Sequence, residues 1–390
     1  MYDAIHQFDP LLLAGDQTAL RERVRVVIDR SVQLKGEVNQ VTLATLRDLV
    51  RSMNSYYSNR IEGQGTHPRN IERALLQDFS DKPDIARLQR IAVAHTEAER
   101  QLEEQRDRVN PRSSTLAITA HRSLYERLAP VDRTTEDDHV IEPGCLRTSA
   151  TAVGRHVPPA HTAVPAFLKR MDEVYTRNFG WEDEVLAVAC LHHRLAWVHP
   201  FRDGNGRTTR LQTHCALSAI SGGLWSPNRG FARHQTDYYA ALANADQPRM
   251  GDLDGRGNLS ARMLDEWCKF FVAVCEDQVQ FMSRMLDLTG IRKRLEALMV
   301  ILGKEDANLS ESLAGPLHYV FLAGNVARGQ FQQMTGASER TASRQLAALL
   351  RRGLLVSDSR VAPVRMAFPL EHLSFLLPEL YPEAATNPAF

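Results

Sequence analysis

Residues 199–210 read His-Pro-Phe-Arg-Asp-Gly-Asn-Gly-Arg-Thr-Thr-Arg, and a stretch with helical spacing of apolar side chains lies on each side of them. Pro200 disfavours helical geometry at His199, so the first helix is expected to end there. Gly204 and Gly206 allow the backbone to turn tightly and to come close to a ligand. The sequence therefore predicts a helix, a tight turn and a second helix whose free N–H groups point at the turn and form an anion site.

The polar residues of this segment suit one kind of chemistry. Arg207 and Arg210 are three residues apart on a helix, so they share a face and can flank a polyphosphate. Asp203 supplies a hard oxygen of the kind that Mg²⁺ binds, and His199 can accept a proton from an attacking hydroxyl. The alternative is a glycine-rich helix corner with incidental polar residues. Because every polar type here is one that the chemistry needs, the segment favours transfer of a phosphorus-containing group.

The segment resembles the signature of Fic-domain proteins, HPFx(D/E)GNGRxxR, and matches it at every defined position. The resemblance implies a protein adenylyltransferase (AMPylator), which transfers AMP from ATP to a protein hydroxyl and releases pyrophosphate. It makes His199 the general base and Asp203 the Mg²⁺ ligand. Family members that phosphorylate carry Lys at the position of Gly206, which argues against kinase activity here. The nucleotide-binding residues implied are Phe201, Arg202, Asp203, Gly204, Asn205, Gly206, Arg207 and Arg210.

Two neighbouring segments extend the resemblance. Residues 141–159 look like the family's flap, a β-hairpin that docks the target segment by adding a strand. The sequence alone would favour a plain surface hairpin, and the family match reverses that preference. Residues 236–246 are similar to the helix that closes over the adenine, so Tyr238 and Tyr239 are candidates to pack on the base, although such aromatic residues are more often core. The docking residues implied in the flap are Ser149, Ala150, Thr151, Ala152, Val153 and Gly154.

Residues 58–63, Ser-Asn-Arg-Ile-Glu-Gly, resemble the inhibitory motif (S/T)xxxE(G/N) of Fic proteins that carry it N-terminal to the core. Gly63 is predicted at the C′ position of a helix, which places Glu62 in the last turn. The helix dipole disfavours a carboxylate there, so Glu62 needs a cationic partner. The resemblance gives Arg210 as that partner, and it makes Ser58, Glu62 and Gly63 the inhibitory residues.

Composition limits the function classes. Of 390 residues, 47 are Lys or Arg and 47 are Asp or Glu, so a globally basic nucleic-acid binder is disfavoured, although a local patch can exist within a neutral total. The chain has 43% hydrophobic and 24% charged residues, which excludes a disordered or collagen-like protein. Five cysteines without a CxxC pair disfavour disulfides and a zinc cluster. With no signal peptide and no membrane-spanning run in the sequence, a cytoplasmic enzyme without a membrane partner is expected.

The C-terminal part predicts a separate module. Residues 317–368 indicate a helix, a short helix, a turn, a third helix and a hairpin, an order that looks like a winged helix. Few acids offset its arginines, so contact with DNA phosphates is one reading, and a protein-interaction or dimer module is an equal alternative. The arginines of the third helix and the wing are Arg340, Arg344, Arg351, Arg352, Arg360 and Arg365.

Together these observations predict a mainly α protein with a Fic-type helical core, a β-hairpin flap and a C-terminal winged helix-turn-helix domain. The expected function is an ATP- and Mg²⁺-dependent adenylyltransferase that is autoinhibited by Glu62 and acts on itself and on a protein substrate; a homodimer is compatible with the sequence. A de-AMPylating hydrolase and a nucleotide-sensing DNA-binding regulator are the alternatives, and a pure sensor has no need of His199. The expected domains are the N-terminal helical region 1–113, the catalytic core 114–250, connecting helices 251–310 and the winged helix 311–377.

Overall fold

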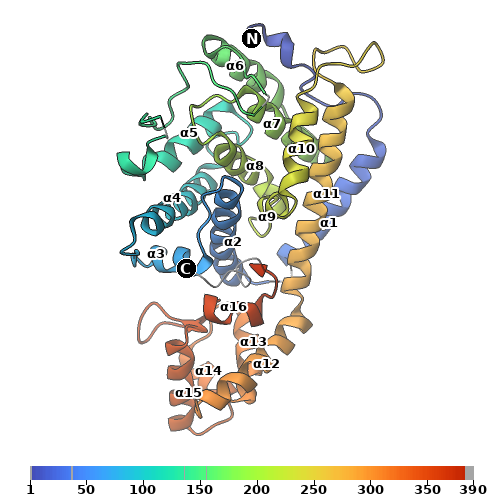
Figure 1. The fold of residues 1–390 in the computed structure, drawn as a ribbon. Helices are drawn as coiled ribbons and strands as arrows, with labels where there is room; N and C mark the ends of the chain where they lie inside the picture. The colour runs from blue at the N-terminus through green and yellow to red at the C-terminus, as the bar shows by residue number, and fades with distance from the viewer. Residues whose placement is uncertain (1, 37, 136, 155, 383–390) are drawn as a thin grey trace.

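A computed structural model describes residues 2–36, 38–135, 137–154 and 156–382 (Figure 1). As predicted, this part of the chain is mainly helical. No helix within it is both long enough and apolar enough to cross a membrane. The helices of the larger, N-terminal body are α1 Thr18–Gly36, α2 Gln40–Ile61, α3 Pro68–Leu75, α4 Pro83–Gln105, α5 Ser114–Tyr125, α6 Val164–Tyr175, α7 Trp181–Val198, α8 Asn205–Ser221, α9 Asn228–Arg233, α10 Gln235–Ala245 and α11 Ala261–Leu286. The next helix, α12 Leu288–Glu305, packs mainly against the C-terminal module.

Helices α7 and α8 form the centre of the body, with α1, α2, α4, α5 and α11 packed around them (Figure 1). Helix α7 is buried on nearly every side, as its almost continuous apolar sequence requires. Helix α8 is equally buried but carries many polar residues, including arginines, threonines and a histidine. Buried polar groups need partners, so the surroundings of α8 must supply hydrogen bonds and counter-charges. This central helix is the one that begins within the segment 199–210.

The flap differs from its prediction. In place of a hairpin over residues 141–159, the described residues form an extended loop with one isolated antiparallel bridge, between Val153 and His156. Other groups hold this loop. The backbone N–H of Arg147 donates to Pro200 O (2.9 Å), and its guanidinium donates to the carbonyls of His199 (2.8 Å) and Pro159 (2.5 Å). The loop is therefore fixed against the segment 199–200 by a backbone hydrogen bond and by the Arg147 guanidinium rather than by a strand ladder.

The C-terminal module follows α12 at the lower end of the molecule (Figure 1). Its two strands pair antiparallel, with Leu355 opposite Met366 and Val356 opposite Arg365. The order of three helices followed by a two-stranded hairpin is the one that the sequence predicted for a winged helix. Its elements are α13 Ala314–Ala323, α14 Arg328–Met334, α15 Glu339–Arg351, β1 Leu355–Val356, β2 Arg365–Met366 and α16 Leu370–Leu376.

Candidate active site

The turn between α7 and α8 is built by its own side chains. Helix α7 ends at Val198, and His199 adopts a left-handed conformation (φ 48°) before Pro200, as the proline predicted. The amide of Asn205 closes the turn, because it accepts from Phe201 N (2.9 Å) and donates to Phe201 O (2.8 Å). Asn205 and Phe201 are buried, so in this structure both residues support the turn from the protein interior.

Asp203 lies in a small polar network at the start of α8. Its Oδ2 accepts from the hydroxyl of Tyr125 (2.7 Å) and from the guanidinium of Arg207 (3.3 Å), which also donates to the Tyr125 hydroxyl (2.8 Å). Burial opposes ionisation of Asp203, but the Arg207 charge and the Tyr125 hydrogen bond outweigh it and lower its pKa. The Asp203 side chain is 47% exposed. A charged, accessible carboxylate is what a Mg²⁺ ligand requires.

Glu62 reaches the catalytic helix from the end of α2. As predicted, Gly63 is left-handed (φ 71°) and Glu62 caps the helix. The Glu62 Oε1 atom accepts from Arg210 at 2.6 Å, and Arg210 also donates to the hydroxyl (2.9 Å) and the carbonyl (3.0 Å) of Ser58. The Arg210 side chain is 1% exposed and the Glu62 side chain 31%. The motif residue and its expected cationic partner are thus brought together in the described residues.

The two motif glycines are needed for different close approaches. Gly204 is left-handed (φ 73°), and a Cβ there would overlap the ring of Tyr125. A Cβ on Gly206 would overlap Glu62 Oε1. The first turn of α8 therefore already accommodates an anionic oxygen where a side chain would not fit. A carboxylate at a helix N-terminus has the negative charge of a phosphate, and it faces the same N–H donors that a phosphate would use.

His199 is poised as a neutral imidazole. Burial lowers its pKa to about 4, against a partial opposing effect of a hydrogen bond with the Ala196 backbone. At neutral pH the ring is therefore unprotonated and can accept a proton. Its carbonyl is fixed by the Arg147 guanidinium, so the loop 141–159 helps to position His199.

The two tyrosines of α10 occupy different environments. Tyr238 is 2% exposed, stacks on Phe231 (4.5 Å between ring centroids) and lies 3.0 Å from His192 Nε2 through its hydroxyl. In this structure Tyr238 is therefore a core residue. Tyr239 is 45% exposed, and its hydroxyl donates to Ile61 O (3.0 Å), at the end of α2. Of the two, only Tyr239 presents a substantial surface next to the site. His192 is buried in the same aromatic cluster.

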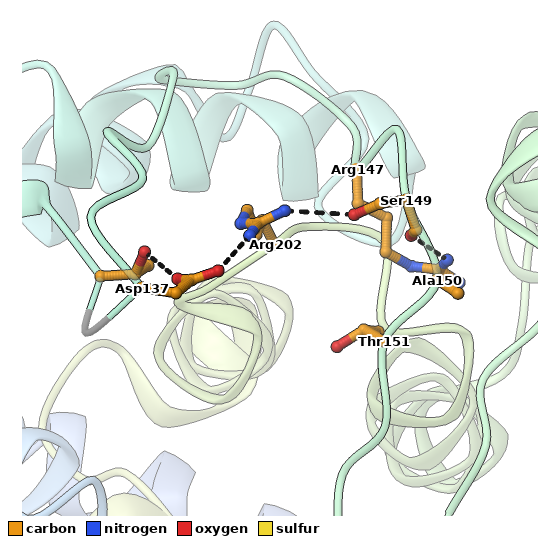
Figure 2. Close-up of a pocket in the computed structure, with 7 residues that line it drawn as sticks. Asp137, Arg147, Ser149, Ala150, Thr151 and Arg202 are labelled. Atoms are coloured by element: carbon orange, nitrogen blue, oxygen red, sulfur yellow. Dashed lines mark hydrogen bonds and ion pairs between the residues drawn. The ribbon is translucent and has the colours of Figure 1, made fainter.

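A cavity of about 470 Å³ opens beside the catalytic turn (Figure 2). Three residues of the predicted docking segment, Ser149, Ala150 and Thr151, line it, and the rest of that segment lies outside. Arg202 also faces this cavity, where it donates to Ser149 Oγ (3.1 Å) and to Asp137. Arg202 thus points to the flap side and not to the first turn of α8.

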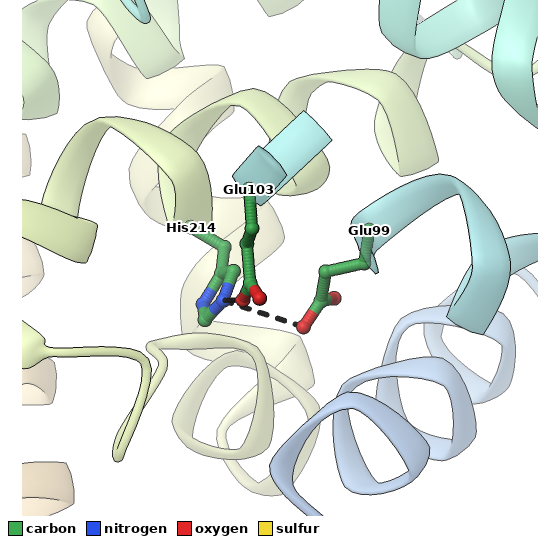
Figure 3. Close-up of side chains that lie close together, drawn as sticks. All are labelled: Glu99, Glu103 and His214. Atoms are coloured by element: carbon green, nitrogen blue, oxygen red, sulfur yellow. Dashed lines mark hydrogen bonds and ion pairs between the residues drawn. The ribbon is translucent and has the colours of Figure 1, made fainter. Parts of the chain in front are cut away.

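A second polar cluster lies behind the site (Figure 3). Glu99 and Glu103 of α4 point at His214 of α8, whose Nε2 lies 3.3 Å from Glu99 Oε1 and 2.9 Å from Glu103 Oε1. Two carboxylates and an imidazole are a metal-ligand set, but the Arg51 guanidinium already neutralises Glu103 at 2.5 Å. Burial raises the pKa of Glu99 to about 7. The carboxylates outweigh burial at His214 and raise its pKa, so the cluster is an ion-pair network that holds protons.

Two residues that support the site were not anticipated from the sequence. Tyr125 orients Asp203 and Arg207. His121 stacks on Phe201 (4.0 Å between ring centroids, 6° between planes) and lies 3.2 Å from Asp203 O through Nε2. The two belong to one face of α5, four residues apart. That spacing of two polar aromatic side chains on one helix face was the available signal.

The geometry brings together the N-terminus of α8, an adjacent carboxylate and a neutral histidine. Residues 111–217 match the model of the Fic/DOC family, and these residues contain the whole segment 199–210. This part of the chain is therefore similar to a Fic/DOC-family domain. Glu62 lies outside the matched residues.

Relatives and a solved structure agree with this assignment. The chain is 30% identical over 167 residues to the protein adenylyltransferase Fic of Nematostella vectensis (42% of this chain, 36% of that protein). It is 34% identical over 114 residues to the protein adenylyltransferase fic-1 of Caenorhabditis elegans (29% of this chain, 21% of that protein). The matches thus cover 36% and 21% of the length of these two curated relatives. A solved fragment of C. elegans Fic-1 has the same fold (TM-score 0.51, 18% identity, 70% of this chain and 74% of that chain).

Proposed function

We propose that this protein is a Mg²⁺- and ATP-dependent protein adenylyltransferase that is inhibited in its resting state by Glu62. The observation that carries the proposal is the arrangement at the start of α8, where Asp203 contacts Arg207, Arg210 holds Glu62, and His199 lies in the turn just before the helix. The relatives are named protein adenylyltransferases, which supports the same reaction class for this chain.

The chain's own groups account for each part of the reaction. The N–H groups at the start of α8, with Arg207 and Arg210, would bind the phosphates of ATP. Asp203 would hold Mg²⁺, which neutralises phosphate charge. His199 would take the proton of a target hydroxyl as its oxygen bonds to the α-phosphorus. The bond from the α-phosphorus to the bridging oxygen then breaks, and pyrophosphate leaves. The cavity beside residues 149–151 would receive the target segment.

Glu62 accounts for the resting state. Productive transfer needs the γ-phosphate anchored so that the α-phosphorus lies in line with the attacking oxygen. In the structure Arg210 is bound by Glu62 and Ser58, and the Glu62 carboxylate lies at the first turn of α8. A γ-phosphate at that place would meet a like charge and an occupied guanidinium. ATP would therefore bind in a pose that does not react.

Incubation of the purified protein with ATP and Mg²⁺ tests the proposal. With Glu62→Gly, label from α-labelled ATP is expected on the protein itself, whereas label from γ-labelled ATP is not. The His199→Ala variant of the same protein is the control. Label from γ-labelled ATP would indicate a kinase, and absence of both labels would remove the transferase assignment. A protein carrying AMP, incubated without ATP, would reveal the reverse hydrolysis on the same core.

DNA binding by the C-terminal module is a second candidate function. The N-terminal part of α15 exposes Arg340, Arg344, Thr341 and Ser343, groups that contact phosphates and base edges. By contrast, Arg351, Arg352 and Arg365 are in ion pairs with acids of the same region. A mobility shift of the full chain with duplex DNA, which weakens as salt rises and is lost in Arg340→Ala/Arg344→Ala, would support this function. No shift at low salt would leave a protein-interaction module.

A further inference from the structure

The inhibitory helix α2 is bound by more than the active site. Its last turn carries Ser58 and Glu62, which hold Arg210. Its middle is tied to α4, where Arg51 donates to Glu103 (2.5 Å) and Asn54 donates to Glu99 Oε1 (2.8 Å), two members of the cluster in Figure 3. These contacts stay within the N-terminal body. Further contacts of α2 lead to the C-terminal part of the chain.

The first half of α2 packs against the C-terminal module. The hydroxyl of Thr42, which is 2% exposed, donates to Phe321 O of α13 at 2.8 Å. At the N-cap of α2, Asn39 lies so close to Gly324 that a Cβ on that glycine would overlap the Asn39 side chain. Strand β2 of the same module also contacts α2. The module is thus docked on the helix that carries the inhibitory motif.

The C-terminal segment 377–382 then returns to the other end of α2, close to the motif. The hydroxyl of Tyr57, a fully buried residue, donates to Leu380 O at 2.9 Å. The Tyr381 ring packs edge-on against Tyr56 (5.3 Å, 87°) and parallel to Tyr57 (6.3 Å, 19°). The Glu379 carbonyl accepts from Arg229 of α9 (3.1 Å), so the segment bridges α2 and α9. Within the described residues these contacts reach Tyr57, the residue directly before Ser58.

These contacts bear on inhibition because the Glu62–Arg210 pair has to be held by a rigid helix end. Helix ends open more easily than helix centres, and contacts from outside raise the cost of opening. Removal of the segment would leave the buried Tyr57 hydroxyl without this acceptor and would remove an aromatic neighbour from two consecutive residues. The turn that carries Ser58 and Glu62 would then separate from Arg210 more often.

We propose that residues 377–382 act as a latch on α2, so that the catalytic core is inhibited only while the C-terminal segment is docked against Tyr56 and Tyr57. The proposal rests on the proposed adenylyltransferase function and adds its regulation by the C-terminal segment. The segment that controls the site in α8 would then lie about 170 residues later in the sequence, and helix α2, which contacts both, would connect them.

The test compares Tyr381→Ala with the wild type, each with and without Glu62→Gly. In the wild-type background, Tyr381→Ala is expected to raise the initial rate of self-labelling by about five- to tenfold, the effect of losing an aromatic contact. In the Glu62→Gly background it should change nothing, because the latch acts only through Glu62. Tyr381→Phe, which keeps the ring, should behave as the wild type. No rise in the wild-type background, or an equal rise in both, would overturn the proposal.

A second variant covers the case in which Tyr381→Ala does not fold, judged by thermal unfolding. Tyr57→Phe removes the hydroxyl that donates to Leu380 but keeps the ring, and it should raise self-labelling about twofold to fivefold, only when Glu62 is present. An unchanged rate in this folded variant would also overturn the latch. Failure of the function is distinguishable, because Glu62→Gly would then remain unlabelled whatever stands at positions 57 and 381.

Discussion

The carboxylate of Glu62 accepts a hydrogen bond from the guanidinium of Arg210 at 2.6 Å, although the two residues are 148 positions apart. Arg210 is buried, so its charge has little access to water and depends on this partner. The same carboxylate lies against Gly206, at the first turn of the catalytic helix. The Glu62 side chain therefore binds the guanidinium of Arg210 and also fills the place beside Gly206 where a phosphate would lie. The proposed reaction would need both.

Replacement of Glu62 by Gly should raise self-adenylylation by about ten- to a hundredfold, because it frees Arg210 to anchor the γ-phosphate. Adding Arg210→Ala should return the rate to near the wild-type level. Incorporation of α-labelled ATP at equal folded concentration measures both. Gly63 already ends the helix, so the variant is expected to fold. A Glu62→Gly protein no more active than the wild type would remove the inhibitory role.

Replacement of His199 by Ala in the Glu62→Gly protein should lower the transfer rate by about 10²–10⁴-fold, the usual cost of losing a general base. Binding of ATP, measured by calorimetry, should change little, because the phosphate-binding groups remain. The matched control is His139→Ala, on an exposed loop. Transfer at a rate similar to that of the control would exclude His199 from proton removal.

The pH dependence of transfer should follow the lowered pKa of His199, about 4. Only the neutral ring can accept a proton, and a lowered pKa keeps the ring neutral to lower pH. The rate of Glu62→Gly should therefore stay nearly constant from pH 8 down to about pH 5 and fall below that. A fall centred near pH 6.5, the ordinary value for histidine, would show that the ring is more exposed to water during reaction than in this structure.

The Tyr125→Phe variant should show whether the Tyr125 hydroxyl positions Asp203 and Arg207 or only stabilises the fold. The lost hydroxyl donates to Asp203 and accepts from Arg207, so the variant should need more Mg²⁺ for half-maximal rate and should lose about tenfold in transfer. Its free energy of unfolding should fall by about 1 kcal/mol. Tyr175→Phe is a matched control, because that hydroxyl donates to Leu11 O (2.6 Å) away from the site. Equal activity losses in both variants would indicate a merely structural role.

Glu99 should make stability fall as pH rises. Its pKa is raised in the folded protein from 4.5 to about 7 by burial, so its stabilising effect is full below pH 4.5 and is lost as pH rises through about 7. Glu99→Gln resembles the protonated form. Between pH 5 and pH 8 the wild type should therefore lose about 2 kcal/mol more of its unfolding free energy than Glu99→Gln does. Parallel curves of unfolding temperature against pH would contradict this.

The sequence predicted the parts of the site that depend on local chain geometry. Neighbouring residues in the sequence determine three features of the site. These are the end of α7 before Pro200, the left-handed Gly63 and the motif residues at the start of α8. The Glu62–Arg210 contact was predicted only through the family resemblance, because no local rule pairs residues 148 apart.

What the sequence did not predict depends on tertiary packing. The described residues of 141–159 form no strand ladder, and Arg147 instead ties this loop to the carbonyls of His199 and Pro159. Tyr238 was a candidate for the nucleotide because of its place in the chain, but the structure buries it among Phe231 and Trp267. Tyr125 and His121 support the site from another helix, and only the packing of α5 on α8 brings them there.

Both members of the Glu62–Arg210 pair belong to the same chain, so the anion at the first turn of α8 is present at a fixed effective concentration in every molecule. The fraction of molecules in which this contact is formed therefore does not depend on the protein concentration. Under the proposed function, nucleotide would enter this site as a competitor of a tethered carboxylate and not as the first occupant of an empty one. Its productive affinity would be reduced by the fraction of time that the pair is closed, and a change that loosens α2 would act on that fraction.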